Sequence, residues 1–354
     1  MKRSLLLIFF VSQLILSQTT RKYSNEFLSI GVDAAAFGMG KAVVATSNNV
    51  NSTYWNPAGL TNVKGYEGAI MHAEYFAGIA KYDYVGFAMP IDYRSALGIS
   101  IIRFGVDDIL NTTELIDNEG NIDYNRISLF SAADYALNVA YARNLTIEGL
   151  TIGANAKIIR RIIGDFATSW GFGIDVGVQY ERNNWKFGLM LRDITTTFNS
   201  WSIDEGEFDK IKNAIPGQNQ ELPESTEITL PKAQLGVARK FLLKRDFNLL
   251  TEIDLNIRFT KTNDLISTDI VSIDPAFGFQ IDYLNTVFLR GGIGNIQNEL
   301  QFDATKELIF QPNFGVGFNY RGIQIDYALT NIGSVGNALY SNVFSIKIAF
   351  NHFR

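Results

Sequence analysis

The most regular feature of the chain is an alternation of apolar and polar residues that runs from Gly68 to Phe353. Alternating segments of about ten residues are separated by short polar turns or by longer polar loops. Successive side chains of a strand point to opposite faces, so each segment has one apolar face and one polar face. The pattern predicts an all-β protein, a transmembrane antiparallel β-barrel with lipid outside and a polar lumen inside.

The pattern predicts about fourteen strands. In the last one, residues 343–353, isoleucine and phenylalanine alternate with polar or small residues. An even number of strands returns both ends of the chain to one side of the membrane, as single-chain bacterial barrels require. The predicted strands are residues 68–78, 81–91, 94–105, 129–143, 149–163, 170–182, 184–193, 231–240, 246–259, 272–283, 286–294, 310–321, 322–330 and 343–353.

The connections between these strands alternate in length. Every second connection is a short turn, at residues 92–93, 144–148, 183, 241–245, 284–285 and 321–322. Most of the others are long: residues 106–128, 194–230, 260–271, 295–309 and 331–342. Only the first connection, at Ile79 and Ala80, is short where a long one is expected. Outer-membrane barrels have short periplasmic turns and longer outer loops, so the long connections are predicted to face the cell exterior.

The chain begins with a segment that differs from the barrel. Lys2 and Arg3 precede an apolar run of about twelve residues, shorter than the roughly twenty that a membrane-spanning helix needs. Charge, length and order predict a secretory signal peptide cleaved near Ser17, with an uncleaved membrane anchor as the alternative. The predicted organisation is a signal peptide at residues 1–17, an N-terminal plug or hatch segment at 18–67 and a barrel at 68–354.

Small residues dominate the segment from Ser29 to Leu60. Side chains this small allow a short helix or coil to lie close against other backbone. The segment closes with Trp55-Asn56-Pro57-Ala58-Gly59, a predicted turn in which proline fixes φ and glycine accepts a left-handed conformation. We therefore predict a plug inside the lumen, whose structural motif consists of Gly31, Gly38, Gly40, Asn56, Pro57 and Gly59.

Composition limits the possible chemistry. The chain has no cysteine, which excludes disulfides, thiol catalysis and cysteine-based metal sites, and its net charge of −5 argues against a nucleic-acid partner.

His72 and His352 lie on the first and last strands, where barrel closure makes them either a metal pair or two unrelated histidines. Gly38-Met39-Gly40-Lys41 lacks the first glycine and the final hydroxyl residue of a phosphate loop. We expect no enzyme activity and no cofactor.

Charged and aromatic residues within the strands have structural explanations. Buried charges need partners, so lumen carboxylates are expected to pair with arginines across the interior. The carboxylates are Asp175, Glu252, Asp254, Asp282 and Asp326, and the arginines are Arg103, Arg192, Arg258 and Arg290. Aromatic residues near strand ends form either interfacial girdles or ordinary core contacts; they are Tyr82, Tyr84, Tyr141, Trp170, Tyr180 and Trp185.

The two longest outer loops, residues 106–128 and 194–230, are acidic. They either dock protein partners or divalent cations at the cell surface or are solvated loops kept soluble by charge. The second loop also carries apolar residues that either grip a partner or pack on the barrel rim. The candidate partner-binding residues are Phe198, Trp201, Phe208 and Ile211.

Three short runs carry a resemblance to a known family. Residues 30–34 (IGVDA), 37–40 (FGMG) and 54–60 (YWNPAGL) resemble the PorV/PorQ family of outer-membrane proteins, parts of the type IX secretion system of Bacteroidetes. With the terminal barrel strand the resemblance spans nearly the whole mature chain. Residues 56–58 (NPA) are also similar, more distantly, to the hatch of FadL-type fatty-acid channels.

The resemblance implies an integral protein of the outer membrane, surrounded by its lipid. It implies as partners the large translocon barrel and the secreted cargo proteins, whose C-terminal signal domain such proteins bind at the cell surface. The alternatives are a FadL-like transporter of hydrophobic small molecules and a scaffold for a partner protein. A closed lumen favours the secretion component, whereas a continuous apolar tunnel ending at the hatch favours the transporter.

Overall fold

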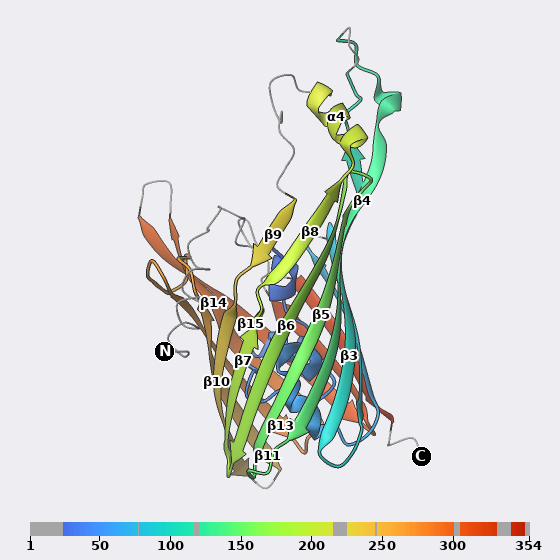
Figure 1. Cartoon of the computed structure of the whole chain (residues 1–354). Helices are drawn as coiled ribbons and strands as arrows, with labels where there is room; N and C mark the ends of the chain where they lie inside the picture. Colours follow the sequence, from blue (N-terminus) through green and yellow to red (C-terminus); the bar gives the residue numbers. More distant parts are fainter. Residues whose placement is uncertain are drawn as a thin grey trace, which may run out of the picture.

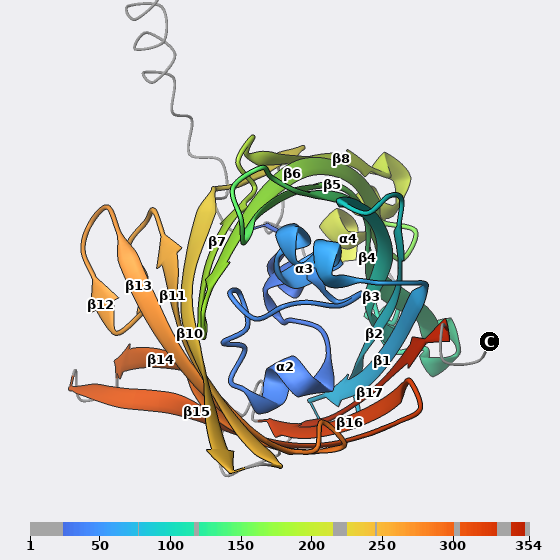
Figure 2. The ribbon, with the colours of Figure 1, turned by 90° about the horizontal axis from the view of Figure 1, so that it is seen from below.

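The chain forms one barrel that surrounds its own N-terminal segment (Figures 1 and 2). The computed structural model describes residues 24–76, 78–116, 120–214, 225–244, 246–300, 305–330 and 341–350, and in 210–214 only the backbone. The predicted signal peptide, His352 and Phe353 lie outside the described residues.

Fourteen strands form the wall, and every neighbouring pair is antiparallel. Strand β1 pairs with both β2 and β17, which closes the ring. The prediction of an antiparallel barrel of about fourteen strands is therefore confirmed. The strands are β1 (Glu67–Tyr75), β2 (Ala80–Pro90), β3 (Ser95–Asn111), β4 (Ser128–Asn144), β5 (Leu150–Ile163), β6 (Ala167–Arg182), β7 (Trp185–Arg192), β10 (Lys232–Lys244), β11 (Phe247–Arg258), β13 (Ser272–Tyr283), β14 (Val287–Leu300), β15 (Lys306–Tyr320), β16 (Ile323–Thr330) and β17 (Ser341–Ala349).

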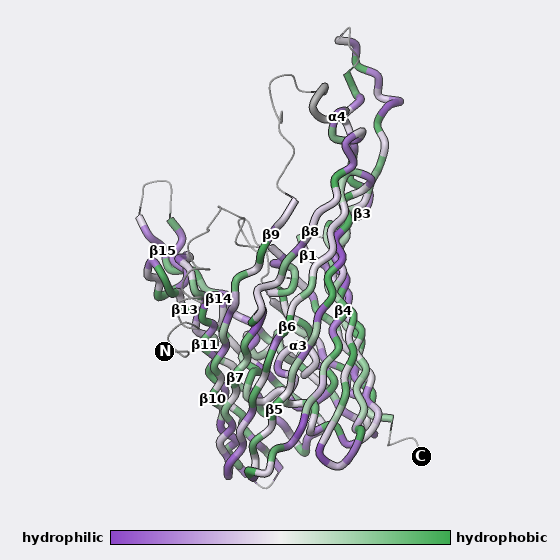
Figure 3. Tube along the Cα trace, viewed as in Figure 1, coloured by the Kyte–Doolittle hydropathy of each residue, from purple (hydrophilic) through white to green (hydrophobic). Residues whose placement is uncertain are grey.

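Alternation along each strand separates a lipid-like outer face from a polar lumen, and hydropathy changes from residue to residue along the wall (Figure 3). On β17, Phe344 is exposed on the outer face, whereas Ser345 is buried and hydrogen-bonds Asp33 inside the barrel. The aromatic residues near strand ends lie on both faces of the wall, some on the outer face and others in the core of the lumen. Trp170 is 60% exposed on the outside, but Tyr82 is buried in the core cluster of the interior.

The two ends of the barrel differ. The end with the short connections, at the bottom of Figure 1, is called the turn end, and the opposite end is called the loop end. Strands β3 and β4 have 17 residues each and form an arm that rises above the loop end, with the short helix η3 (Tyr124–Arg126) near its tip. Strand β1 has only 9 residues, so the wall is much lower on that side.

The connection at residues 194–230 is not the plain loop that the sequence suggested. It contains β8 (Thr197–Ile203), α4 (Glu205–Ala214) and β9 (Thr226–Thr229). Strand β8 pairs with the upper part of β6 and with β9, so it continues the wall where β7 ends. A further short strand, β12 (Ile266–Ser267), pairs with β13 near the loop end.

Residues 24–66 occupy the lumen, as the view along the barrel shows (Figure 2). Within the described part of the chain, no helix combines the length and the apolar character needed to cross a membrane. The segment instead contains four very short helices joined by turns. They are η1 (Glu26–Ser29), α2 (Ala34–Gly38), α3 (Ser52–Trp55) and η2 (Pro57–Asn62).

Candidate functional site

Residues 24–66 inside the lumen, called the plug, and the cavity between the plug and the loop end form the candidate site. Helix α2 lies against the wall formed by β14, β15 and β16 because both surfaces lack side chains at the contact. A Cβ added to Gly38 would lie 2.9 Å from the Cα of Gly315, and one added to Gly40 would lie 2.8 Å from the amide of Ile293. Glycine is needed here for the close approach of two backbones.

The other half of the plug, η2, contacts β3, β4, β5 and β6. The side chain of Asn56 caps η2 by accepting from the amide of Ala58 at 3.2 Å, and Pro57 occupies the first turn, where its missing N–H costs nothing. The Asn56 amide also donates to the carbonyls of Val44 at 2.9 Å and Val178 at 3.2 Å. Asn56 therefore fixes the start of η2 and ties it to both the plug and the wall.

Two carboxylates of β11 hold the middle of the plug. Asp254 accepts from the amides of Val43 and Val44 at 2.9 and 3.1 Å. Glu252 accepts from the amide of Ala45 at 2.6 Å and from the hydroxyl of Thr46. Both carboxylates are almost fully buried, so the plug backbone supplies donors that such groups need. The expectation that they pair with arginines is wrong for these two residues.

Of the other arginines expected in the lumen, one forms the expected ion pair there and another lies outside the barrel. Arg290 and Asp326 form a buried pair at 2.7 Å inside the lumen, as expected. Arg103 instead lies outside, with Asp107 at 3.2 Å and Asp83 at 3.7 Å. The expectation that Arg103 lies in the lumen is therefore wrong. Successive residues of β3 point to opposite faces, and the neighbouring Ile102 is the one that is buried inside.

The wall is interrupted next to the plug, where β7 passes into β8. Asp193 and Thr196 both have positive φ, at 55° and 58°, so the chain turns between the two strands. The buried Lys157 ammonium lies 2.8 Å from Asp175 and 2.5 Å from Asp193, and the amide of Asp193 donates to Asp175. This cluster stabilises the interruption, and its lysine was not singled out by the sequence analysis. The signal that could have identified Lys157 is the alternation of β5, which places this lysine on the inward face between outward-pointing neighbours.

Gly31 and Trp55 meet at the centre of the plug. Gly31 has φ of 106°, and a Cβ there would lie 3.1 Å from the Trp55 ring. The indole is almost fully buried and its Nε1–H donates to the carbonyl of Val32 at 2.9 Å. The ring also packs edge-on against Tyr54, with centroids 4.9 Å apart. The sequence analysis included Trp55 only as part of a turn, whereas the structure places its side chain at the middle of the lumen.

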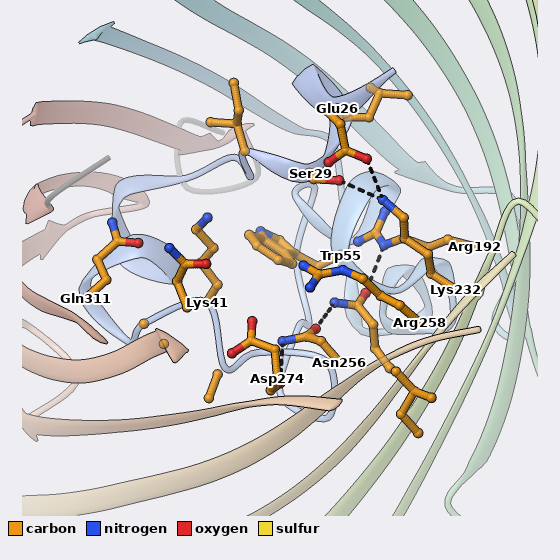
Figure 4. Close-up of a pocket in the computed structure, with 18 of the residues that line it drawn as sticks. Glu26, Ser29, Lys41, Trp55, Arg192, Lys232, Asn256, Arg258, Asp274 and Gln311 are labelled. Atoms are coloured by element: carbon orange, nitrogen blue, oxygen red, sulfur yellow. Dashed lines mark hydrogen bonds and ion pairs between the residues drawn. The ribbon is translucent and has the colours of Figure 1, made fainter. Parts of the chain in front are cut away.

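A cavity of about 360 Å³ lies on the loop-end side of Trp55 (Figure 4). Arg192 donates to Gln234 at 2.8 Å and lies 4.7 Å from the centroid of the Tyr54 ring. The charged side chains among the described residues that line the cavity are Lys41, Arg192, Lys232, Arg258, Glu26 and Asp274. The lining is therefore polar with an excess of positive charge.

Lys41 is unusual among these side chains. Burial lowers its pKa from 10.5 to about 8, and the nearby Asp274 opposes part of that shift. Its ammonium lies 5.5 Å from the centroid of the Phe37 ring. Between about pH 8 and 10.5 the unfolded chain holds this proton and the folded chain does not. The contribution of Lys41 to folding stability therefore becomes more favourable as pH rises through that window.

We expect Lys41 to react with a small water-soluble acylating reagent with a half-maximal rate near pH 8. The neutral amine is the nucleophile, so a lowered pKa means that Lys41 becomes neutral and reactive at a lower pH than an ordinary lysine. Lys261 is the matched control, because the hydrogen bond that its ammonium donates to Asp269 raises its pKa. Peptide mass spectrometry after acylation at graded pH measures both residues in one sample. Parallel titration of Lys41 and Lys261 would contradict the assignment.

The four candidate partner-binding residues do not form one surface. Phe198 is 57% exposed on the outer face of β8, whereas Trp201 is half-buried beside Arg161, which lies 5.0 Å from the centroid of its ring. Phe208 is partly buried on α4, and Ile211 lies on the same helix, where its side chain is outside the described residues. Their role in binding a partner stays a prediction.

His72 does not contact a second histidine in the described residues. Its Nδ1 lies 2.7 Å from Asp83 on the neighbouring strand. Among the described residues no group of three or more histidine, aspartate or glutamate side chains is placed to hold a metal ion.

The comparison with protein families shows which family the chain belongs to. The family described as "Type IX secretion system protein PorV" matches residues 17–263, more than half of the chain. The chain belongs to the PorV family. This PorV-family protein is accordingly an outer-membrane β-barrel of the type IX secretion system.

Solved structures show the same fold at low sequence identity. The toluene transporter TodX of P. putida is 13% identical, with a TM-score of 0.54 over 90% of this chain and 98% of that chain. A FadL homologue of Pseudomonas aeruginosa is 11% identical, with a TM-score of 0.52 over 89% of this chain and 97% of that chain. No curated protein matches the chain. The PorV-family barrel is therefore FadL-like in fold.

Proposed function

We propose that this PorV-family protein binds secreted cargo proteins, and the translocon barrel that exports them, through the surface at its loop end. The observation that carries the proposal is the β3–β4 arm (Figure 1). About 9–11 tilted residues suffice for a strand to cross a bilayer, and β3 and β4 have 17 each. The arm therefore extends above the membrane as paired sheet, which is rigid enough to present a docking surface.

Exposed apolar side chains lie along this arm. Ile116 is 61% exposed, Ile122 57% and Tyr124 71%, and a bridge between Ile116 and Ile122 holds the tip together. Apolar side chains in water at the end of a rigid arm are typical of a protein-binding surface. The proposed action is recognition without catalysis.

The alternative, transport of hydrophobic molecules, is less well supported. It needs a continuous apolar tunnel that ends at the plug. The cavity at the loop end is instead lined by Lys41, Arg192, Lys232 and Arg258, together with two carboxylates. A charged lining disfavours an apolar ligand, because desolvating those groups costs free energy.

The proposal is tested with a variant in which Ile116, Ile122 and Tyr124 are all replaced by serine. Interface residues of this kind each contribute more than about 1 kcal/mol when they are central, so we expect at least a tenfold loss of cargo bound to the purified protein. Tyr93→Ser is the matched control, because Tyr93 is 86% exposed at the turn end. Cargo is quantified by mass spectrometry after affinity purification in mild detergent. Undiminished cargo binding by the triple variant would exclude the arm as the docking surface.

The proposed location requires export of the chain across the inner membrane. We propose that the signal peptide is removed near Ser17, which leaves a mature protein that begins close to residue 18. Intact-mass measurement of the protein isolated from outer membranes gives the N-terminus directly. A mass that includes residues 1–17 would show an uncleaved anchor.

A further inference from the structure

The lumen contains a second cavity, on the turn-end side of the plug. Its volume is about 330 Å³, close to the 360 Å³ of the cavity on the loop-end side. Polar residues of the plug, including Ser47, Asn48 and Asn49, face it from one side. Charged residues of the wall face it from the other side, and these include Lys186, Lys240 and Lys347.

Trp55 separates the two cavities. Among the described residues it alone lines both of them, and Figure 4 shows its ring in the middle of the side chains that line the outer cavity. The two halves of the plug also lie close against the wall. A Cβ added to Gly292 would lie 2.2 Å from Met39, and one added to Gly153 would lie 2.5 Å from Ala58. The plug backbone thus touches the wall on both sides, and the buried indole of Trp55 lies between the two cavities.

The segment Ser24–Ser29, called the strap, holds this indole in place. Tyr54, which packs edge-on against Trp55, donates its hydroxyl to the carbonyl of Leu28 in the strap. Trp55 itself donates to the carbonyl of Val32 just beyond the strap. Displacement of the strap would therefore remove a support of the Tyr54–Trp55 pair.

The strap is in turn anchored to the wall at the loop end. Ser24 hydrogen-bonds Thr229 of β9 at 2.8 Å and accepts from Asn199 of β8 at 2.7 Å. Asn25 donates to the same threonine at 3.0 Å, and Lys232 of β10 lies 3.1 Å from Glu26. Strands β8 and β9 are the two ends of the segment that carries α4. The loop end and the Trp55 ring are thereby joined by a continuous set of contacts.

We propose that the lumen is a closed passage for small anions, in which Trp55 is the gate and the strap keeps the gate shut. The lining determines the class of solute. In the described residues four cationic and two acidic side chains line the outer cavity, and four cationic and two acidic side chains line the inner one. An excess of fixed positive charge along a narrow passage attracts anions and repels cations.

Conductance in a planar lipid bilayer tests the gate. The wild-type protein is expected to be closed in KCl, whereas Trp55→Ala conducts and its reversal potential in a KCl gradient shows preference for chloride. Trp55→Phe keeps an aromatic ring in the gap and remains closed. A folded Trp55→Ala variant that does not conduct, or that prefers potassium, would overturn the proposal. Heat-modifiable electrophoretic mobility identifies the folded barrel.

Thiol labelling gives a second measurement that does not depend on reconstitution. The chain has no cysteine, so a single introduced cysteine is the only target. Asn48 is exposed to the inner cavity and Ser29 lines the outer one. A charged, membrane-impermeant thiol reagent added to intact cells is expected to label Ser29→Cys in every background, but Asn48→Cys only together with Trp55→Ala. Labelling of Asn48→Cys with Trp55 intact, or its absence in the double variant, contradicts a gate at Trp55.

Thr229→Val tests the strap while leaving Trp55 unchanged. It removes the hydroxyl that bonds both Ser24 and Asn25, and keeps the shape of the side chain. We expect brief chloride-selective openings in the bilayer that the wild-type protein lacks. A Thr229→Val protein as silent as the wild type would show that the strap does not hold the gate.

Discussion

Trypsin is expected to cut the plug after Lys41 when Glu252 and Asp254 are both replaced by alanine, and to leave the wild-type plug intact. The double change removes the acceptors of three backbone amides and one hydroxyl between Val43 and Thr46. Each buried donor left without a partner costs about 1–3 kcal/mol, so the plug loses on the order of 4 kcal/mol of attachment. Gel electrophoresis of the digested membranes reports the cut.

The paired variant Glu252→Gln with Asp254→Asn is the control. Its amide oxygens still accept from the plug, so the plug remains largely protected. Equal protection of the wild-type, alanine and amide proteins would mean that the close backbone contacts, and not these carboxylates, retain the plug. Cleavage within the barrel strands would indicate general unfolding instead.

A methyl group at Gly292 is expected to displace α2 from the wall. The added Cβ would lie 2.2 Å from the carbonyl carbon of Met39 and 2.3 Å from the amide nitrogen of Gly40. Both neighbours are backbone atoms, so the plug must move, at a cost of about 1–3 kcal/mol. We expect Gly292→Ala to speed tryptic cleavage at Lys41 and to leave the barrel folded.

Gly68→Ala is the matched control for this change. The nearest atom to its added Cβ is 3.4 Å away, in the flexible side chain of Phe350 on the outer face. The same substitution there should leave both the plug and the barrel unchanged. Faster cleavage in both variants would point to a general effect of replacing strand glycines, and no change in either would remove the steric argument.

Strand alternation accounts for how much of the wall could be predicted. In a barrel each inward residue is followed by an outward one, so a single strand such as residues 343–353 already reveals both faces. The same rule places Glu252 and Asp254, two residues apart on β11, together in the lumen. It could not supply their partners, because the amides that they accept from belong to a segment about two hundred residues earlier.

The connection at residues 194–230 shows where local pattern fails. Its charges and mixed apolar residues suggest a loop, yet β8 is a strand because the upper edge of β6 has no other partner once β7 ends at Arg192. Unpaired backbone N–H and C=O groups at a strand edge cost free energy, so the upper edge of β6 pairs with the nearest extended segment, which is β8. Pairing across the sheet, and not local propensity, decides the structure there.

The sequence by itself determined the antiparallel barrel, its strand number, the asymmetry of its two ends and its membership of the PorV family, because alternation, turn length and the N-terminal motif are local signals. Only the tertiary structure decided that Trp55 separates two cavities, that Lys41 faces the outer one and that the strap joins β9 to the plug. These relations depend on the position of the plug inside the closed ring. That position results from contacts between residues far apart in the chain, which no local pattern records.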